Sequence, residues 1–378
     1  MKHIIYIIRK GLLLLVNCFR RSVMIGDLKE VFRNNHSIEN KACPGEKAWL
    51  KKWRALDRNV SPMSYRYYYN YLGADSNIVP PDTARQFIEP ILNPGDSERF
   101  YNDKNSFGLF IDAEDMPKTL FRYIGDSLYD GEYNSVSPDN LNYHLSSVNQ
   151  VIVKPAKELG GAGIVFFDRK GDVLVNKDNE PLSIELLKKM YKRDFLIQEC
   201  FVQSDYIAQF NNTSINTIRL NTYRDIKSGE IHILGAVLRI GPKGSRVDNA
   251  SLGGVFIGID DNGKLGSCAF DKYGNKYTGY NDLDFSNSEF SIPNWDKVKA
   301  FAIKISKRVP HMRLFALDIV LDANNNPKLI EVNSNNFSVY FLQLTKQPVF
   351  GEFTDDIIEY CLENKQYLNI IASSTIRQ

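Results

Sequence analysis

The sequence predicts an α+β protein with a mostly helical N-terminal region. Residues 314–336 form two apolar runs around an Asn-rich turn, which is the pattern of a β-hairpin. The apolar, β-branched run 216–223 reads as a further strand, whereas 295–309 has the apolar spacing of a helix. Near the start of the chain, 45–56 also fits a helix. Strands and helices therefore both contribute to the core.

Composition limits the class of function. A chain of 378 residues with 43% hydrophobic content can form a large core and two or three lobes. The 47 basic and 45 acidic residues leave a formal charge of +2, which gives no electrostatic case for nucleic-acid binding. The five cysteines are scattered and form no Cys-x-x-Cys pair, so neither a disulfide framework nor a zinc site is indicated. We expect a reducing compartment.

The hairpin at 314–336 carries acidic residues inside apolar runs. A turn centred between Asn324 and Asn325 sets Asp318 opposite Glu331, and alternation places Asn333 on the same face as Glu331. Two ionised carboxylates in an apolar sheet repel each other and lose hydration. A Mg²⁺ ion would offset both costs, with Asn333 as a neutral third oxygen ligand.

The same acidic pair has structural alternatives. A salt bridge to Arg219 or Arg313 would also neutralise a buried carboxylate, and a half-exposed sheet would let the carboxylates face solvent. Spacing alone does not choose between the metal and the ion pair.

A glycine-rich segment follows a predicted strand. The run 150–155 ends in Lys154 and Pro155, and Gly160, Gly161 and Gly163 come next. Glycines let backbone N–H groups approach an anion, and Lys154 adds a positive charge beside them. The segment is neither a Walker loop nor a dinucleotide fingerprint, and an ordinary hairpin turn is the alternative.

Two further stretches suggest substrate contacts. Arg219 and Asn221 share one face of the strand 216–223, and an inward-facing Arg needs a carboxylate or phosphate partner. The long, polar, Gly-rich stretch 241–256 is typical of a substrate loop, and also of a plain surface loop.

The N-terminal segment 1–21 is apolar and basic. Arg9, Lys10 and Gly11 interrupt its apolar run and no cleavage site follows, which argues against a signal peptide. The run 12–16 is too short to span a bilayer. Two interpretations stay open: a helix lying on an anionic membrane surface, or a first helix packed on the body, which is the commoner use of such helices.

Taken together, the motifs are more informative than any one of them. Their order along the chain is Asp103-Lys104, Lys154-Pro155 with the Gly-rich loop, Gln198-Glu199, Asn216-x-x-Arg219, Asp318, and Glu331-x-Asn333. This order resembles the ATP-grasp superfamily, and most closely its sugar-transfer-associated branch. The resemblance runs from about Phe100 to the end of the chain, and no motif of the first hundred residues belongs to it.

The resemblance implies an ATP-grasp fold, in which two α+β lobes with antiparallel sheets sandwich ATP. We therefore expect three regions. Residues 1–99 would be a helical, aromatic-rich region that contacts the membrane surface or a substrate. Residues 100–202 would be the N-terminal and central ATP-grasp lobe, and 203–378 the C-terminal lobe with the metal site.

The resemblance also assigns nucleotide-binding residues. Those expected to contact ATP are Lys104 and Lys154 for the phosphates, Gly160, Gly161 and Gly163 in the covering loop, Gln198, Glu199 and the Phe201 backbone for adenine, and Asp205 for the ribose.

The remaining assignments concern the metal and the reaction. By resemblance, Mg²⁺ (with Mn²⁺ as an alternative) is held by Asp318, Glu331 and Asn333. Arg219 faces the transferring phosphoryl group or an acyl phosphate, and Arg246 and Asn249 reach the γ-phosphate or the acceptor.

The implied activity is an ATP-dependent carboxylate–amine ligase that works through an acyl phosphate. The expected product is an amide, such as an amino acid joined to a uronic acid, in surface polysaccharide or capsule synthesis. Two alternatives remain: a kinase acting on a sugar-like hydroxyl, and a non-catalytic nucleotide-binding subunit of a glycan-assembly complex. Phosphoryl transfer relies on positioning and charge neutralisation, in agreement with the absence of a Ser-His-Asp or Cys-His set.

We expect the protein in the cytoplasm, at the inner face of the membrane if residues 1–21 bind there. Its expected partners are small-molecule or glycan carboxylates and amines. The oligomeric state stays open, with a homodimer as one expectation.

Overall fold

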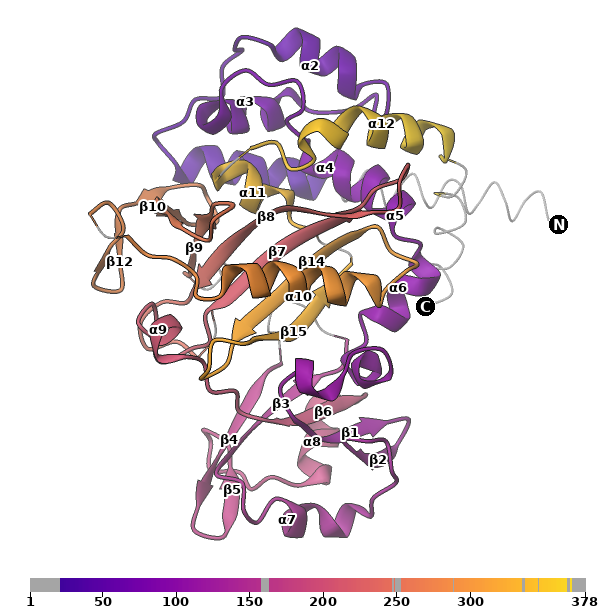
Figure 1. The fold of residues 1–378 in the computed structure, drawn as a ribbon, viewed down its shortest axis with the longest axis vertical. Helices are drawn as coiled ribbons and strands as arrows, with labels where there is room; N and C mark the ends of the chain where they lie inside the picture. The colour runs from indigo at the N-terminus through magenta and orange to yellow at the C-terminus, as the bar shows by residue number, and fades with distance from the viewer. Residues whose placement is uncertain are drawn as a thin grey trace, which may run out of the picture.

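Two antiparallel sheets, with a layer of N-terminal helices beside the larger one, make up the protein (Figure 1). The structure is a computed structural model, and the residues that it describes are 21–157, 163–246, 248, 253–287, 289–334, 337–345, 347–365 and 368. In Figure 1 the N-terminal helices lie at the top, the larger sheet in the middle and the smaller sheet at the bottom.

The smaller sheet has six strands in the order β2-β1-β6-β3-β4-β5, all paired antiparallel. Their bounds are β1 Thr119–Ile124, β2 Ser127–Asp130, β3 Gln150–Pro155, β4 Val165–Lys170, β5 Val173–Val175 and β6 Phe195–Glu199. The helices α7 (Leu141–His144) and α8 (Ile184–Tyr191) pack against it, and Leu141, Ile184 and Leu187 share its core.

The larger sheet has seven antiparallel strands in the order β11-β10-β9-β8-β7-β14-β15. Their bounds are β7 Thr217–Arg224, β8 Ile231–Ile240, β9 Val255–Ile259, β10 Leu265–Phe270, β11 Lys276–Tyr277, β14 Leu314–Leu321 and β15 Pro327–Asn333. A small hairpin of β12 (Gly279–Tyr280) and β13 (Leu283–Asp284) lies apart from this sheet. The predicted pair of antiparallel sheets is therefore confirmed.

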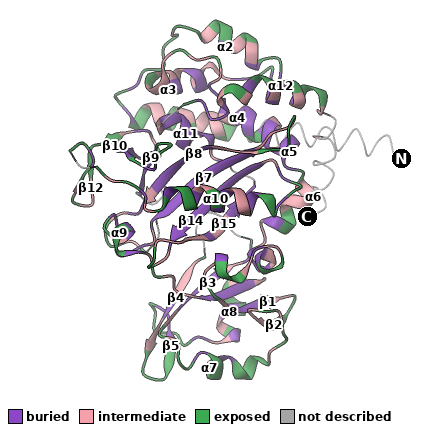
Figure 2. Ribbon diagram, in the orientation of Figure 1, coloured by how far each residue is buried: buried purple, intermediate pink, exposed green. Residues whose placement is uncertain are grey.

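Both faces of the larger sheet are covered, which explains why its central strands are the most buried part of Figure 2. The helix α10 (Trp295–Lys307) covers one face, where Leu317 and Ile319 of β14 enter its core. Successive strand residues point to opposite faces, so Leu314 and Ala316 enter the other core, formed with the N-terminal and C-terminal helices. Asp318 continues this second face beyond Leu314 and Ala316.

The N-terminal helices share one core with the C-terminal helices. The helix α6 Gly95–Tyr101 follows this layer and contributes Tyr101 to the other core, which α10 covers. The layer itself consists of the helical stretch 21–34, α2 Glu46–Trp53, α3 Pro62–Leu72, α4 Pro81–Thr83, the π-helical turn η1 Ala84–Ile88 and α5 Glu89–Leu92. They pack with α11 Val339–Thr345 and α12 Thr354–Glu363. The short elements η2 Lys104–Leu109, η3 Ala113–Asp115, η4 Pro138–Asn140, α9 Asp205–Ala208 and η6 Gly351–Phe353 complete the described helices.

The hairpin β14–β15 pairs Asp318 with Glu331, as predicted. Closer to the turn, however, Ile319 pairs with Leu329, one residue out of the predicted register. A β-bulge at Ile330 absorbs the extra residue and restores the register, so both carboxylates stay on one face. The turn itself is therefore shifted slightly from the predicted centre, while the pairing at the acidic residues is correct.

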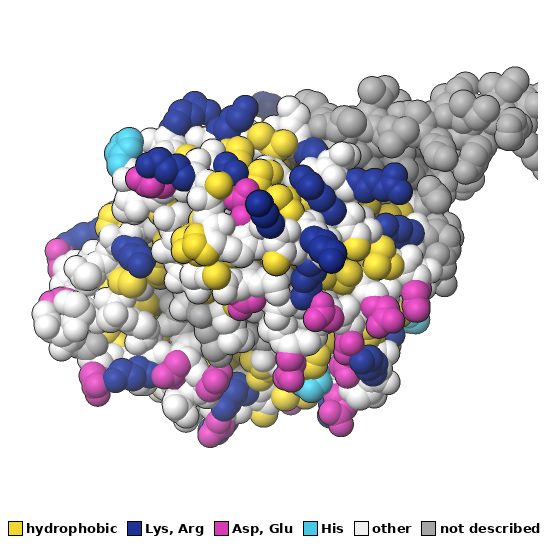
Figure 3. Space-filling model, turned by 90° about the horizontal axis from the view of Figure 1, so that it is seen from above, with side chains coloured by type: hydrophobic (Ala, Val, Ile, Leu, Met, Phe, Trp, Pro, Cys, Tyr) yellow, Lys and Arg dark blue, Asp and Glu magenta, His cyan; other side chains and the backbone are white. Residues whose placement is uncertain are grey.

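The predictions for the N-terminal segment fall largely outside the described residues, which begin at Arg21. None of the described helices has the length and apolar content needed to cross a bilayer. Seen from above, Lys and Arg side chains gather over the helical layer, with hydrophobic side chains between them (Figure 3). On α2, Lys47 and Lys51 are exposed, and so is Arg54 at its C-terminal end.

Candidate active site

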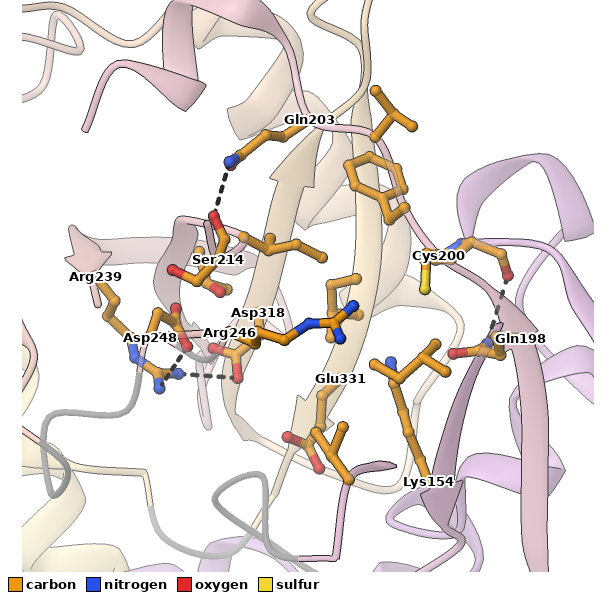
Figure 4. A pocket seen from close by; sticks show the side chains of 18 of the residues that line it. Lys154, Gln198, Cys200, Gln203, Ser214, Arg239, Arg246, Asp248, Asp318 and Glu331 are labelled. Atoms are coloured by element: carbon orange, nitrogen blue, oxygen red, sulfur yellow. Dashed lines mark hydrogen bonds and ion pairs between the residues drawn. The ribbon is translucent and has the colours of Figure 1, made fainter. Parts of the chain in front are cut away.

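A cavity of about 620 Å³ lies between the two sheets. Ile152, Ile164 and Phe166 line it from the smaller sheet, and Ile330 lines it from β15. In Figure 4, Lys154 and Gln198 stand on one side of this cavity, and Arg239, Asp318 and Glu331 on the other. The volume falls within the range of small-molecule sites, and the mixture of apolar walls and a few polar groups is typical of them.

Lys154 is the buried cation on the smaller-sheet side. It alternates with Ile152 on β3, so both residues face the cavity. Burial lowers the pKa of Lys154 to about 8, and the positive charge of Lys104 acts in the same direction. Burial removes the water that would otherwise stabilise the charged ammonium of Lys154. An anionic ligand such as a phosphate would stabilise that charge in place of the water.

The end of β6 and the segment after it carry the residues that are predicted to contact adenine and ribose. Gln198, Glu199, Phe201 and Asp205 all line the cavity. The Gln198 side chain is oriented by donating a hydrogen bond from Nε2 to Thr119 Oγ1 at 3.0 Å. The structure thus brings four residues that are close in sequence to one wall.

The edge of that wall is polar and open. Glu199 forms an ion pair of 2.8 Å with Lys118, and Asp205 is exposed in the first turn of α9. This edge is open to solvent, and the ribose contact at Asp205 stays a prediction.

Asp318 is held by two arginines of neighbouring strands. Arg219 Nε donates to Oδ1 at 2.5 Å and Nη2 donates to Oδ2 at 2.9 Å, while Arg239 Nη1 lies 3.4 Å from Oδ2. Burial alone would raise the pKa of Asp318, but the two guanidinium groups outweigh it and the pKa is lowered. Asp318 therefore forms the salt bridge that the sequence offered as an alternative to a metal site, and its partner is Arg219 and not Arg313.

Glu331 and Asn333 complete the predicted metal set. Glu331 Oε1 lies 2.7 Å from Lys104 Nζ, and Asn333 Nδ2 lies 3.4 Å from Asp318 Oδ2. All three predicted ligands line the same cavity. Asp318 has both oxygens engaged by Arg219, so Glu331 is the more accessible of the two carboxylates for an ion.

The donor chemistry fits Mg²⁺. Two carboxylates and an amide are hard oxygen donors, and Mg²⁺ commonly takes one or two protein carboxylates together with water and nucleotide phosphates. Within the part of the chain that the structure describes, no cluster of three or more His, Cys, Asp or Glu side chains could hold a metal.

The structure describes only some of the residues predicted in the two glycine-rich stretches. Arg246 Nη1 lies 3.2 Å from Asp168 Oδ2, and its guanidinium lies 3.8 Å from the ring centre of Phe166. Arg246 therefore reaches across the cavity from the larger-sheet side to β4. Gly163 has a φ of 72° and is not among the residues that line the cavity. Gly160, Gly161 and Asn249 lie outside the described residues.

Arg239, Asp248 and Tyr340 also line the cavity and were not predicted. Arg239 Nη2 lies 3.2 Å from Asp248 Oδ1. Burial would lower the pKa of Arg239, but the carboxylates of Asp248 and Asp318 outweigh it and the pKa is raised. Alternation along β8, applied as it was to Arg219, would have identified Arg239 as a polar residue on the same sheet face. Asp248 lies outside the described helices and strands, and Tyr340 lies in the short helix α11, for which no sequence pattern was identified.

Solved structures offer distant similarities. The chain is similar to the ATP-grasp ligase PsnB in complex with a phosphomimetic precursor variant, Mg and ADP, with 15% identity, a TM-score of 0.39, and coverage of 71% of this chain and 61% of that one. It is also similar to D-alanine–D-alanine ligase from Bacillus anthracis (12%, TM-score 0.38, coverage 72% and 70%) and to VanG D-Ala:D-Ser ligase from Enterococcus faecalis (11%, 0.38, 71% and 62%). The chain thus spans about three fifths of the PsnB length. Among curated proteins, none matches it.

The family comparison covers most of the chain. The model described as sugar-transfer associated ATP-grasp matches residues 97–357, which begins just before Lys104 and includes the cavity between the sheets. It excludes the helices before residue 97. The chain therefore belongs to the sugar-transfer associated ATP-grasp family.

Proposed function

We propose that the protein is an ATP-dependent carboxylate–amine ligase that forms an amide through an acyl phosphate. The observation that carries this proposal is the cavity between the sheets, where the buried Lys154 faces the Arg219–Asp318–Arg239 network. This arrangement suits the binding of phosphate and of a second anion such as a carboxylate.

The chemistry follows from these charges. The substrate carboxylate attacks the γ-phosphorus of ATP, the bond to the β-phosphate oxygen breaks, and ADP leaves. Lys154 attracts the phosphates, and Arg219 and Arg239 are placed to stabilise the negative charge on the transferred group. Glu331 and Asn333, with Asp318, would hold Mg²⁺, which when bound neutralises phosphate charge. An amine then displaces phosphate from the acyl carbon.

The family description supports a setting in sugar transfer. On that basis we propose that the carboxylate or the amine belongs to a surface polysaccharide or its precursor, for example a uronic acid joined to an amino acid. Phosphorylation of a sugar-like hydroxyl is the competing reaction, because it would use the same nucleotide site.

The test is product analysis. The protein is incubated with Mg²⁺-ATP and extracts of activated sugars and amino acids, with hydroxylamine added to trap any acyl phosphate as a hydroxamate. The proposal predicts ADP, free phosphate and hydroxamate, all strongly reduced in Lys154→Met and kept in Lys170→Met, at an exposed lysine on β4. A stable phosphoester would show a kinase. ATP binding without turnover on any extract would favour a non-catalytic subunit.

We further propose peripheral contact with an anionic membrane through residues 1–21. The exposed basic residues of the adjoining helical layer support this location (Figure 3). Full-length protein should co-sediment with phosphatidylserine vesicles more than with neutral vesicles. Removal of residues 1–20 should abolish the difference, and unchanged sedimentation would reject the contact.

A further inference from the structure

A small cavity, of about 10 Å³, lies beside Lys154 between the two sheets. Lys154, Gln198 and Ile330 line both this cavity and the large one, so the two cavities are neighbours. The other residues that line it are Lys104, Phe107, Met116, Thr119, Arg122, Leu196 and Leu329. Among the described residues around it, three carry a positive charge and none carries a negative charge. We call it the Arg122 cavity.

The sheet register brings two of these cations into one row. Arg122 of β1 is paired with Leu196 of β6, and Leu196 is paired with Lys154 of β3. Residues directly opposite on neighbouring strands project from the same face of a sheet. The backbones of Arg122 and Lys154 are two strand spacings apart, roughly 10 Å, which two long side chains can bridge through one ion above Leu196. Leu329 and Ile330 of β15 close the cavity from the larger sheet.

Arg122 is buried without a carboxylate partner. The residue is 2% exposed, its Nη1 donates to the carbonyls of Lys104 and Asn105 at 3.3 Å each, and its guanidinium lies 4.6 Å from the Tyr133 ring centre. Nε is covered and has no hydrogen-bond partner among the described residues. Burial lowers the pKa of Arg122, but a guanidinium stays charged throughout the physiological pH range. A buried, charged donor is therefore left unsatisfied, which is costly.

The carboxylates whose charges act on these two cations are paired with other residues. Glu331 acts on Lys154 and forms an ion pair of 2.7 Å with Lys104. Asp103 acts on the guanidinium and lies 3.4 Å from Lys157 Nζ. Two positive charges at the cavity therefore have no described carboxylate within ion-pair distance. A bound anion would supply the missing negative charge.

The neutral groups of the cavity also suit an anion. Gln198 Nε2 donates to Thr119 Oγ1 at 3.0 Å, so this oxygen serves as an acceptor and its own proton is left to donate. Hydroxyl, guanidinium and ammonium groups can thus all present hydrogens to one ligand. The volume is about that of one water-sized sphere, which excludes polyatomic anions such as sulfate or a nucleotide phosphate.

We propose that the Arg122 cavity binds one halide-sized monovalent anion between Arg122 and Lys154, and that this anion weakens the binding of ATP. The bound anion neutralises the Lys154 charge that would attract a nucleotide phosphate, and it repels the phosphate as well. The effect on ATP rests on the proposed nucleotide site, whereas the anion site itself does not. Chloride is the natural candidate, and bromide is a probe of similar size.

The anion is located first in wild-type protein. Crystals of the full chain are grown in sodium bromide, and bromide is identified by its anomalous scattering. The proposal predicts an anomalous peak within hydrogen-bonding distance of Arg122 Nε and Lys154 Nζ. A density peak without anomalous signal would identify water as the occupant and would overturn the proposal, and so would an empty cavity.

Thermal unfolding measures the anion site in solution, in chloride and in gluconate of equal ionic strength. Gluconate is too large for the cavity, so chloride should raise the unfolding temperature of the wild type on the order of 2 °C above gluconate. Arg122→Met, which removes the charge, should lose this difference, and Arg193→Met, at an exposed arginine, should keep it. If Arg122→Met does not fold, Lys154→Met serves as the second variant. A chloride effect of equal size in the cavity variant and in the control would contradict the site.

Calorimetric titration with ATP measures the coupling in the same two salts, at a fixed Mg²⁺ concentration. Wild-type affinity should be about fivefold weaker in chloride, and Arg122→Met should show no such difference. Equal wild-type affinity in both salts would overturn the proposed effect on ATP. If the wild type binds no ATP in either salt, the proposed function fails, while the bromide peak and the chloride-dependent unfolding still decide the anion site.

Discussion

The two sheets meet at one cavity but carry their charges differently. On the smaller sheet, Lys154 forms no ion pair with another described side chain, and burial holds its pKa at about 8. On the larger sheet, Asp318 is matched by Arg219 and Arg239, and Glu331 by Lys104. A phosphate therefore finds an incompletely satisfied cation on one side and paired charges on the other. An anionic ligand can therefore pair with Lys154 directly, whereas on the larger sheet a ligand must replace an existing ion-pair partner.

The largest expected effect comes from removing one partner of the ion pairs on the larger sheet. Arg219→Met should destabilise the protein by about 3–5 kcal/mol, because it leaves the buried Asp318 with only the longer contact to Arg239. Urea unfolding measures this change. The double variant Arg219→Met/Asp318→Asn should recover most of the stability, since the uncompensated charge is then gone. An equal loss in both variants would show that packing, and not charge, explains the effect.

A smaller effect is expected at Lys154 on the smaller sheet. Lys154→Met should weaken ATP binding about 10- to 100-fold at neutral pH, since a buried charge-assisted contact to phosphate is lost. Calorimetric titration measures it, with Lys170→Met as the control. If Lys154→Met binds ATP as well as the control does, the buried lysine is not a phosphate contact.

The pH profile sharpens the same comparison. Lys154 is charged below pH 8 and neutral above it, so ATP affinity of the wild type should fall as pH rises through about 8, while Lys154→Met should not follow this fall. Stability changes in the other direction. The folded pKa lies below the free value of 10.5, so burial destabilises the wild type fully below pH 8, and this penalty is relieved between about pH 8 and 10.5. Parallel pH curves for the two proteins would contradict this assignment.

The smallest effect should come from the contact that bridges the two walls. Arg246 is partly exposed, and it joins the larger-sheet side to Phe166 and Asp168 of β4. Surface ion pairs and exposed cation–π contacts each contribute up to about 1 kcal/mol, so Arg246→Ala should change ATP affinity by no more than about tenfold. Arg193→Ala, at an exposed arginine, is the matched control. A loss of several hundredfold would instead indicate that Arg246 contacts the phosphates.

Sequence patterns predicted local geometry better than they predicted partners. Alternation placed Asp318 opposite Glu331, and the bulge at Ile330 preserved that pairing although the turn is shifted. The choice between Mg²⁺ and arginine at Asp318 could not be made, because Arg219 lies 99 residues away and meets it only when β7 pairs with β14. Spacing within one strand carries no information about the neighbouring strand.

The other omissions have the same physical origin. Arg239 lies on a third strand, β8, which is far from the acidic hairpin in the sequence and pairs with β7. The cavity of about 290 Å³ beside the N-terminal helices depends on helices from one end of the chain packing against residues 338–340 near the other end. Such contacts follow from tertiary packing, and their polar residues follow no period in the sequence.

The most direct test of the account is the Mg²⁺ dependence of ATP binding, measured by calorimetric titration with Mg²⁺ and with EDTA. Wild-type protein should bind ATP more tightly with Mg²⁺, and Glu331→Gln should lose this enhancement on the order of 100-fold while keeping its metal-free affinity. An enhancement of undiminished size in Glu331→Gln, or a wild type that binds no ATP under either condition, would contradict the assignment of this cavity to magnesium and nucleotide.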